Sequence, residues 1–178
     1  MSIGSLKENI NLEKRVSITP ETAKNIIALG LNINLEKNYA THLGIKDQQY
    51  EDVGVKFYNN SSEIINNSKL LLKVNCPTDE EIKNLKEKNI IIGIFNPSKN
   101  EKKLKEISQK NINIFSLELL PRISRAQSMD VLSSQSNLAG YRAVIESIYE
   151  FEKAVPMMMT AAGTVPAAKV LVIGAGVA

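Results

Sequence analysis

The stretch Lys169-Val-Leu-Val-Ile-Gly-Ala-Gly-Val-Ala178 decides the fold class of this chain. An apolar run that opens onto Gly174 and Gly176 is typical of the first strand and turn of a βαβ unit, where glycines let the backbone approach a pyrophosphate. The pyrophosphate then lies at the N-terminus of the next helix. The third glycine and the acidic residue of such a fingerprint would follow Ala178. We therefore expect the protein to be longer than these residues. The alternative is a strand that ends in an ordinary glycine-rich turn.

Composition and charge restrict the functions that the chain can have. The 178 residues are 43% hydrophobic and 23% charged, which is ordinary for a soluble globular chain. A net charge of +3 with scattered lysines gives no indication of nucleic-acid binding. The single Cys76 excludes an internal disulfide and is expected to be a small buried residue, and the single His42 has no second His or Cys with which to share a metal.

The chain shows no sequence signal for a membrane span or for secretion. No apolar run reaches the ~18 residues that a spanning helix needs. The N-terminus lacks the apolar core of a signal peptide. We therefore expect a cytoplasmic chain, which leaves open an association with a membrane partner.

Strand-like and helical stretches alternate along the sequence. Several of the strand-like stretches are continuous apolar runs, as expected for parallel strands that are buried on both faces. The expected strands are Ser2–Leu6, Ile33–Leu35, Leu70–Val74, Ile90–Phe95, Ile112–Leu117 and Val170–Ile173. The pattern predicts an α/β fold with a flavodoxin-like parallel-sheet lobe.

Capping residues mark where the helices begin. Thr19 and Pro20 suit the N-cap and the first turn of one helix, and Gly30 follows its end. Thr78 and Glu81 form a capping-box pattern at the start of another. A third helix is expected over residues 100–110.

The longest helix is predicted from about Ser134 to Lys153. Apolar side chains recur three or four residues apart along it, so most of one face is apolar; they are Leu138, Tyr141, Ile145 and Ile148. The uncharged segment Met157–Pro166 is interpreted as a packed connection. We expect a lobe over residues 1–130, a linking helix and connection over 131–168, and the start of an incomplete Rossmann lobe over 169–178.

A dense polar segment, Arg122–Val144, lies before and within this long helix. Two arginines, a glutamine, an aspartate and several serines stand close together in it. One interpretation is that Asp130, Ser133 or Ser134 caps the helix while the arginines lie on the surface. Capping does not explain why Arg122, Arg125 and Gln127 occur together.

At this segment the sequence resembles the NAD(H)-binding domain of the alpha subunit of proton-translocating nicotinamide nucleotide transhydrogenases. The resemblance rests on residues 121–144 and 169–178, and extends to Glu13–Pro20 and Leu71–Asn75. It covers nearly the whole chain. Alanine dehydrogenase and the saccharopine dehydrogenases belong to the same superfamily and share Arg15, Lys73 and parts of the central segment.

The resemblance implies roles for individual residues. Arg122, Gln127 and Asp130 match a mobile loop beside the nicotinamide end of NAD(H), and Ser133 matches a serine that contacts the nicotinamide. Gln127 would help to bring NADH against the NADP⁺ of a partner subunit. The pyrophosphate turn is matched at Gly174, Gly176 and Val177.

The resemblance also implies an activity and partners. The chain would be the NAD(H)-binding component of an enzyme that transfers hydride between NADH and NADP⁺. The NADP(H) would be held by a beta subunit, and a membrane domain would couple the reaction to proton translocation. A homodimer, peripheral at the inner membrane through its partners, is implied in the same way. Without the rest of the dinucleotide lobe, these 178 residues would be inactive.

Two alternative functions remain at this point. An alanine dehydrogenase-like enzyme would use Arg15 and Lys73 on its substrate, but it needs a histidine in the loop after the fourth strand, and Ile94–Ser98 has none. Arg15 and Lys73 are then interpreted as remnants paired with Glu8 or Glu13. The other alternative is a non-catalytic lobe that acts as an interaction module.

Overall fold

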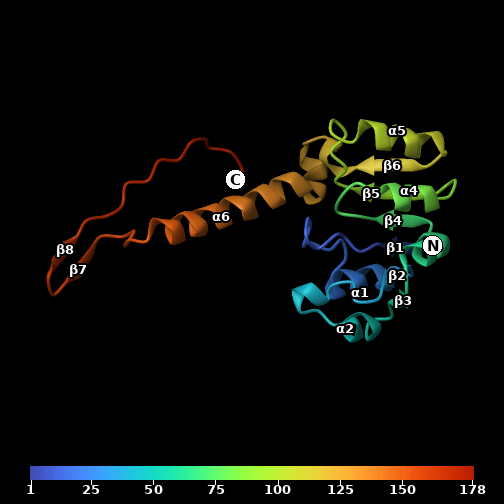
Figure 1. The fold of residues 1–178 in the computed structure, drawn as a ribbon, viewed down its shortest axis with the longest axis horizontal. Coiled ribbons are helices and arrows are strands. Elements are labelled where there is room, and N and C mark those ends of the chain that lie inside the picture. The colour runs from blue at the N-terminus through green and yellow to red at the C-terminus, as the bar shows by residue number, and fades with distance from the viewer. The chain divides into compact units, whose positions relative to one another are not determined.

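Six parallel strands form one sheet in the order β3-β2-β1-β4-β5-β6 (Figure 1). The strands are β1 Ser2–Ser5, β2 Asn32–Glu36, β3 Lys56–Tyr58, β4 Leu70–Leu72, β5 Ile90–Gly93 and β6 Asn113–Ser116. The parallel α/β class expected from the apolar runs is confirmed. Without β3 the order is flavodoxin-like, and β3, which the sequence did not indicate, adds one strand beyond β2.

The computed structural model describes residues 1–178, which form two units, Met1–Leu120 and Pro121–Ala178. The first unit contains the sheet and five α-helices. These are α1 Pro20–Ala28, α2 Asp47–Glu51, α3 Ser61–Asn67, α4 Asp79–Asn84 and α5 Glu101–Gln109. Two short 3-10 helices, η1 Thr41–Leu43 and η2 Leu117–Leu119, complete it. The expected division at residue 130 stays a prediction.

The helix starts predicted from capping residues are confirmed. The side chain of Thr19 accepts a hydrogen bond from the Thr22 amide, and Pro20 opens α1. At α4, Thr78 Oγ1 accepts from the Glu81 amide at 3.2 Å, and Glu81 Oε2 accepts from the Thr78 amide at 2.8 Å. Each cap satisfies amides that have no partner inside the helix.

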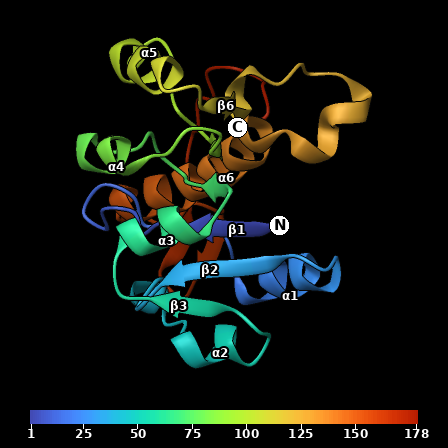
Figure 2. The ribbon, with the colours of Figure 1, turned by 90° about the vertical axis from the view of Figure 1, so that its right-hand side faces the viewer.

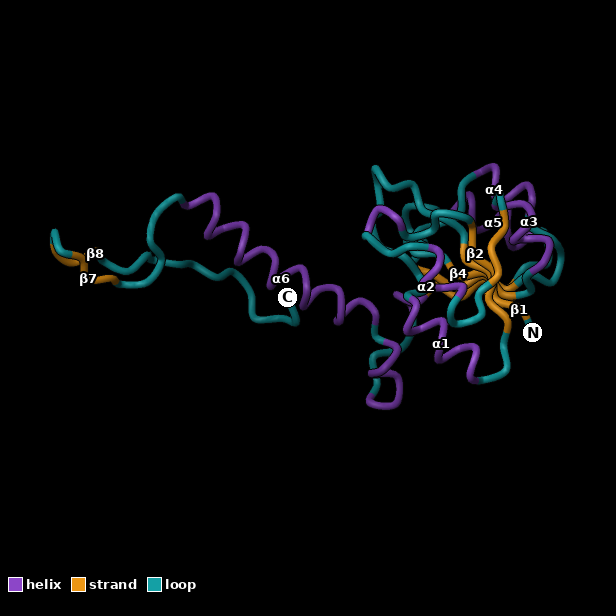
Figure 3. Tube along the Cα trace, turned by 90° about the horizontal axis from the view of Figure 1, so that it is seen from below, coloured by secondary structure: helices purple, strands orange, loops and turns teal.

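Helices cover both faces of the sheet, and each face has its own core (Figures 2 and 3). One core packs strand residues such as Ile33 and Leu35 with residues of α1 and α2. The other packs Leu71 and Ile91 with residues of α3, α4 and α5. Because successive residues of a strand point to opposite faces, an apolar run supplies both cores at once.

The close approach of α3 to the sheet depends on Gly4 in β1. A Cβ atom at this position would lie 2.6 Å from Ile64 Cγ2 and 2.6 Å from Ser68 Oγ. No real side chain tolerates such contacts, so the residue must be glycine for α3 to pack here. The sequence analysis did not identify α3, α2 or β3, because their runs of three to seven residues carry little periodicity.

The second unit contains the long helix and a small hairpin. After the 3-10 helix η3 Ser124–Met129 come α6 Val131–Phe151 and the antiparallel strands β7 Met158–Thr160 and β8 Gly163–Val165. The long helix is confirmed, and it begins three residues earlier than expected. Its apolar stripe is exposed, since α6 has no buried residue.

Two expectations for the second unit were wrong. Residues 170–173 form no strand and are 75–92% exposed, because a strand forms only when a neighbouring strand pairs with its backbone and no strand lies beside them. The segment Met157–Pro166 is an exposed hairpin and not a packed connection; Met159 is 87% exposed.

None of the helices combines the length and the apolar character that are needed to cross a bilayer.

Candidate functional site

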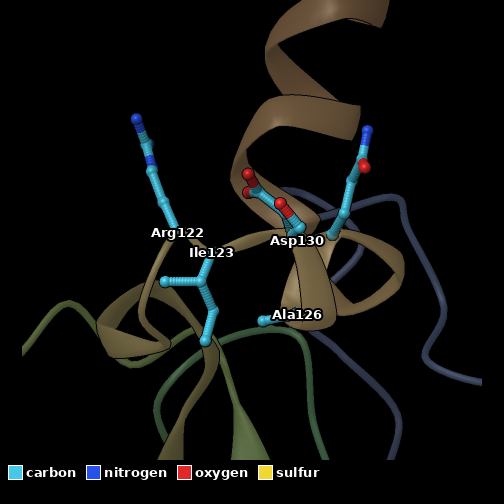
Figure 4. Close-up of a pocket in the computed structure, with 6 residues that line it drawn as sticks. Arg122, Ile123, Ala126 and Asp130 are labelled. Atoms are coloured by element: carbon cyan, nitrogen blue, oxygen red, sulfur yellow. The ribbon is translucent and has the colours of Figure 1, made fainter.

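The polar segment singled out in the sequence forms a small hollow in front of α6. Residues of η3 and its flanks line a space of about 260 Å³. Its lining consists of Arg122, Ile123, Ser124, Ala126, Gln127 and Asp130. Figure 4 shows Arg122 and Asp130 toward one side of this hollow and the apolar Ile123 and Ala126 toward the other. Three predicted site residues, Arg122, Gln127 and Asp130, therefore share one concave surface.

Asp130 is the N-cap of α6. Its Oδ1 accepts a hydrogen bond from the Ser133 amide at 2.9 Å, and its Oδ2 accepts from the Ser133 hydroxyl at 2.6 Å. Its backbone carbonyl accepts from the hydroxyl of Ser134 at 3.0 Å. The capping interpretation is thus confirmed for Asp130. Its side chain still lines the hollow, so capping and ligand contact do not exclude each other.

Hydrogen bonds keep the Asp130 carboxyl ionised. The Ser133 hydroxyl and then the Ser133 amide lower the pKa of Asp130 below its usual value, and the charge of Arg122 adds a smaller effect in the same direction. At neutral pH, Asp130 is therefore a hydrogen-bond acceptor only. It can orient a ligand that donates hydrogen bonds, but it carries no proton to give.

The hydroxyl of Ser133 donates its hydrogen bond to Asp130. A hydroxyl has one donor and two acceptor sites, so Ser133 Oγ retains acceptor capacity toward a ligand. The carboxamide of a nicotinamide offers two N–H donors. Ser133 and Asp130 therefore fit a carboxamide better than they fit a carboxylate or a phosphate.

The side chains of Arg122 and Gln127 are exposed at the same hollow. Arg122 carries five N–H donors in a planar fork, and Gln127 carries both a donor and an acceptor group. Neither side chain is buried or locked by packing. The loop therefore presents donors and acceptors that a ligand can engage without first breaking a buried ion pair.

The predicted pyrophosphate turn does not line this hollow. Gly174 has a φ of +109°, a conformation that favours glycine, and Val177 is 55% exposed. Because the preceding residues 170–173 are extended chain without a paired strand, the strand–turn geometry of a dinucleotide site is absent here. The pyrophosphate roles of Gly174, Gly176 and Val177 stay predictions.

A second cluster of charged side chains lies in the first unit, in the segments that follow β1 and β4. Lys73 Nζ donates to Glu81 Oε1 at 2.8 Å and lies 3.8 Å from Glu8 Oε2. Arg15 pairs with Glu13, with Nη2 2.7 Å from Oε2. The expected pairing of Arg15 and Lys73 with Glu8 and Glu13 is confirmed. Glu81 is the partner that sequence reasoning missed, because its capping-box role already accounted for it.

The loop after β5 contains no histidine. In that loop the Asn96 amide donates to the Glu118 carboxylate. His42 follows β2 instead, and its Nε2 lies 2.7 Å from the Lys14 carbonyl oxygen. Cys76 is half-buried against the core, and burial raises the pKa of its thiol, which disfavours the reactive thiolate.

Known families match the chain in two consecutive segments. The family described as alanine dehydrogenase/PNT, N-terminal domain, matches residues 4–139. The C-terminal domain of the same family matches residues 143–178. The first match alone covers well over half of the chain.

Curated relatives match the chain over its full length. A protein of Rickettsia prowazekii, named as the first portion of an NAD(P) transhydrogenase subunit alpha, is 44% identical over 100% of this chain and 48% of its own length. One of Haemophilus influenzae named NAD(P) transhydrogenase subunit alpha is 42% identical over 100% of this chain and 34% of its own. The chain thus spans half or less of the length of these relatives.

A solved structure agrees with the family match. The crystal structure of a transhydrogenase from Sinorhizobium meliloti superposes on 99% of this chain and 53% of its own chain, with a TM-score of 0.93 and 42% identity. At this identity the likeness extends beyond the fold to the sequence. The chain belongs to the alanine dehydrogenase/PNT family, whose N-terminal domain accounts for residues 4–139.

Proposed function

We propose that this chain is part of the NAD(H)-binding component of a transhydrogenase, the alpha subunit of an enzyme that transfers hydride between NADH and NADP⁺. The observation that carries the proposal is the identity of 42–44% along the whole chain to proteins named as transhydrogenase alpha subunits. The loop from Arg122 to Ser133 supports it, because its free donors and acceptors suit a carboxamide and a ribose.

Direct hydride transfer is chiefly a problem of positioning. Bound NADH supplies the hydride, and the two nicotinamide rings must approach to roughly 3–3.5 Å in the correct orientation. Proton transfer by a side chain is not required at that step. Asp130 and Ser133 would orient the carboxamide, Arg122 would bind through forked hydrogen bonds, and Gln127 would bring NADH against NADP⁺.

Several further features of the proposed enzyme depend on its partners or on the rest of the dinucleotide lobe. NADP(H) would be bound by a beta subunit, and a membrane domain would couple hydride transfer to proton translocation. The protein would be cytoplasmic, peripheral at the inner membrane through these partners, and a homodimer. Gly174, Gly176 and Val177 would form the pyrophosphate turn once the dinucleotide lobe is complete.

Two observations count against an alanine dehydrogenase-like activity. Arg15 and Lys73, the residues such an enzyme would use on its substrate, already hold the chain's own carboxylates. The loop Ile94–Ser98 contains no histidine, and an imine–ketone interconversion needs a proton shuttle near pH 7. An interaction module without catalysis remains the alternative if no transfer is found.

The decisive experiment uses the full-length gene product mixed with its NADP(H)-binding partner. Reduction of an acetylpyridine analogue of NAD⁺ by NADH is followed with and without NADP(H). We expect transfer only when both the partner and NADP(H) are present. Oxidation of L-alanine by NAD⁺ without any partner would instead establish an amino-acid dehydrogenase, and inactivity in both assays would favour the interaction module.

A further inference from the structure

The hollow in front of α6 has an apolar side to which the proposed roles of its polar residues give no function. Figure 4 places Ile123 and Ala126 on that side, away from Arg122 and Asp130. All four residues line the same space of about 260 Å³. Pockets that enclose a whole ligand usually measure roughly 300–1,000 Å³, so this hollow suits one end of a larger ligand. An end that is polar on one side and apolar on the other would match it.

The two apolar residues of the hollow differ in exposure. Ala126 is 7% exposed and is packed into the protein, whereas Ile123 is 56% exposed. Single exposed apolar side chains are common on protein surfaces and need no function by themselves. Ile123 differs from these because it lines a concave space together with charged groups. A group that binds in this space removes the apolar surface of Ile123 from water, which is favourable.

The backbone of Ile123 is held by hydrogen bonds at both ends of the residue. Its amide donates to the Pro121 carbonyl oxygen at 3.0 Å, and its own carbonyl oxygen accepts from the Ala126 amide at 2.9 Å. Its φ of −122° and ψ of 159° are extended, a conformation that suits a β-branched side chain. Ile123 is therefore exposed at the hollow although its backbone is fixed by the start of η3.

The nicotinamide end of NAD(H) is divided in the same way as the hollow. Its carboxamide has N–H groups for which Asp130 and Ser133 offer acceptors. Its ring has two flat faces that gain dispersion and hydrophobic contact against an apolar side chain. When the carboxamide is directed to Asp130, the ring is left for the side of the hollow that Ile123 forms.

Reduction changes the charge of this ring. The ring is neutral in NADH and carries one positive charge in NAD⁺. Contact with an apolar side chain displaces water from the ring, and this costs more for a charged ring than for a neutral one. Asp130 attracts the cationic ring and Arg122 repels it, so the effects of these two charges oppose each other. The effect of Ile123 adds to theirs and favours the reduced ring.

We propose that Ile123 is a specificity-determining residue of the hollow: the nicotinamide ring packs against its side chain, and this contact favours NADH over NAD⁺. The inference rests on the proposed binding of NAD(H) by this chain and adds an apolar residue to the polar ones. The contact holds the hydride donor of the proposed reaction more tightly than its oxidised product.

The test compares two dissociation constants of the full-length gene product. Binding of NADH and of NAD⁺ is measured separately by calorimetry, without NADP(H), so that no hydride is transferred. Ile123→Ala removes three side-chain carbons, of which the ring would cover one side, so the affinity for NADH should fall by about tenfold. The affinity for NAD⁺ should fall much less, because its ring regains hydration. The preference for NADH should therefore decrease by nearly the same factor.

Two further variants serve as controls. Ile123→Leu keeps all four side-chain carbons and should retain the wild-type preference. Met129→Ala changes an apolar residue of the same 3-10 helix that is 50% exposed and does not line the hollow, and it should alter neither affinity. Circular dichroism checks that the variants fold, which we expect because both side chains are exposed.

The fluorescence of bound NADH gives a second measurement, independent of affinity. The reduced ring emits more strongly when it is shielded from water. Emission per bound NADH should therefore decrease in Ile123→Ala and stay at the wild-type level in Ile123→Leu and Met129→Ala. A residue that only supports the loop from a distance would not change this emission at saturation.

Three results would overturn the inference. Equal losses of NADH and NAD⁺ affinity in Ile123→Ala would mean that the contact does not distinguish the two rings. Unchanged affinities and unchanged emission would mean that the ring does not touch Ile123. The same loss of preference in Met129→Ala would assign the effect to the loop as a whole. A wild-type protein that binds neither nucleotide would instead contradict the proposed function, and the inference would fail with it.

Discussion

The two charged regions of this chain differ in the burial of their polar side chains, which are buried and paired in one region and exposed in the other. In the cluster of Glu8, Lys73 and Glu81, Lys73 is buried and donates hydrogen bonds to both oxygens of Glu81. In the loop from Arg122 to Asp130, Arg122 and Gln127 are exposed around a hollow of about 260 Å³. Buried charges must be paired within the protein, because an unpaired buried charge is very costly. Exposed charges are free to meet a ligand.

This contrast indicates where a binding function should be sought. Arg15 and Lys73 have the residue types of a substrate site, yet both already hold carboxylates. Among the residues that line the hollow, Asp130 has hydrogen-bond partners within the protein, Ser133 and Ser134 at the start of α6. Stability should therefore respond to changes in the cluster, and the proposed hydride transfer should respond to changes in the loop.

The largest expected effect is the loss of stability in Lys73→Met. The change leaves Glu8 and Glu81 buried without their cation, and breaking a buried pair in this way costs about 3–5 kcal/mol. Urea denaturation at neutral pH measures it. Lys105→Met is the matched control, because its pair with Glu101 is exposed and should contribute little. Equal losses in the two variants would remove the distinction between buried and exposed pairs.

The next effect is on catalysis, in Gln127→Asn. The substitution withdraws the amide by one methylene, and a misplacement of that size can slow a positioned reaction by about 100-fold. We expect the rate of hydride transfer to fall far more than the affinity for NADH. Single-turnover transfer and NADH titration of the enzyme with its partner measure the two quantities. Gln109→Asn, at an exposed site in α5, should change neither. An equal loss of rate and affinity would contradict a positioning role.

A smaller effect is expected for Asp130→Asn. Asparagine caps helices as well as aspartate does, so α6 should keep its start while the loop loses its negative charge. Because a hydrogen bond to a charged group is stronger than one to a neutral group, transfer should slow by about tenfold. Asp130→Ala loses the cap as well, and only this variant should lower the helix content seen by circular dichroism. Unchanged transfer in both variants would remove Asp130 from the site.

The lowered pKa of Asp130 also predicts a pH effect at the cap. The stabilisation of α6 by ionised Asp130 is present above the ordinary aspartate pKa of about 3.9 and is lost as the pH falls through the lowered value. Helix content of the wild type should therefore decrease in that acidic range, and Asp130→Asn should lack this component. A decrease of the same size in both proteins would assign it to other carboxyl groups.

The smallest effect is expected for Glu13→Gln. The pair with Arg15 is partly exposed, and such pairs contribute less than about 1 kcal/mol. Arg15 lowers the pKa of Glu13 chiefly through a side-chain hydrogen bond, so the contribution is present above the ordinary glutamate pKa and is lost as the pH falls through the lowered one. Urea denaturation at neutral and acidic pH measures it. A loss comparable to that of Lys73→Met would show that Arg15 belongs to the buried cluster.

The candidate site could be located from the sequence more easily than it could be described. The density of polar residues from Arg122 to Ser133 is visible without a structure, and Arg122, Gln127 and Asp130 do line one hollow. Residue types alone do not show that the Ser133 hydroxyl donates its proton to Asp130; the distance between Ser133 Oγ and Asp130 Oδ2 does. Glu81 was missed for a similar reason, since the sequence predicts its cap but not that Lys73 reaches the same carboxylate.

Local sequence patterns were enough to predict the parallel α/β class, the capped starts of α1 and α4, and the long helix, because apolar runs and capping residues act over a few neighbouring positions. Three features could be seen only in the folded chain: the place of β3, the partners of Lys73 and the unpaired state of residues 170–173. These features depend on which segments meet in space. A strand needs a neighbour for its backbone, and a buried charge needs a partner from elsewhere in the chain.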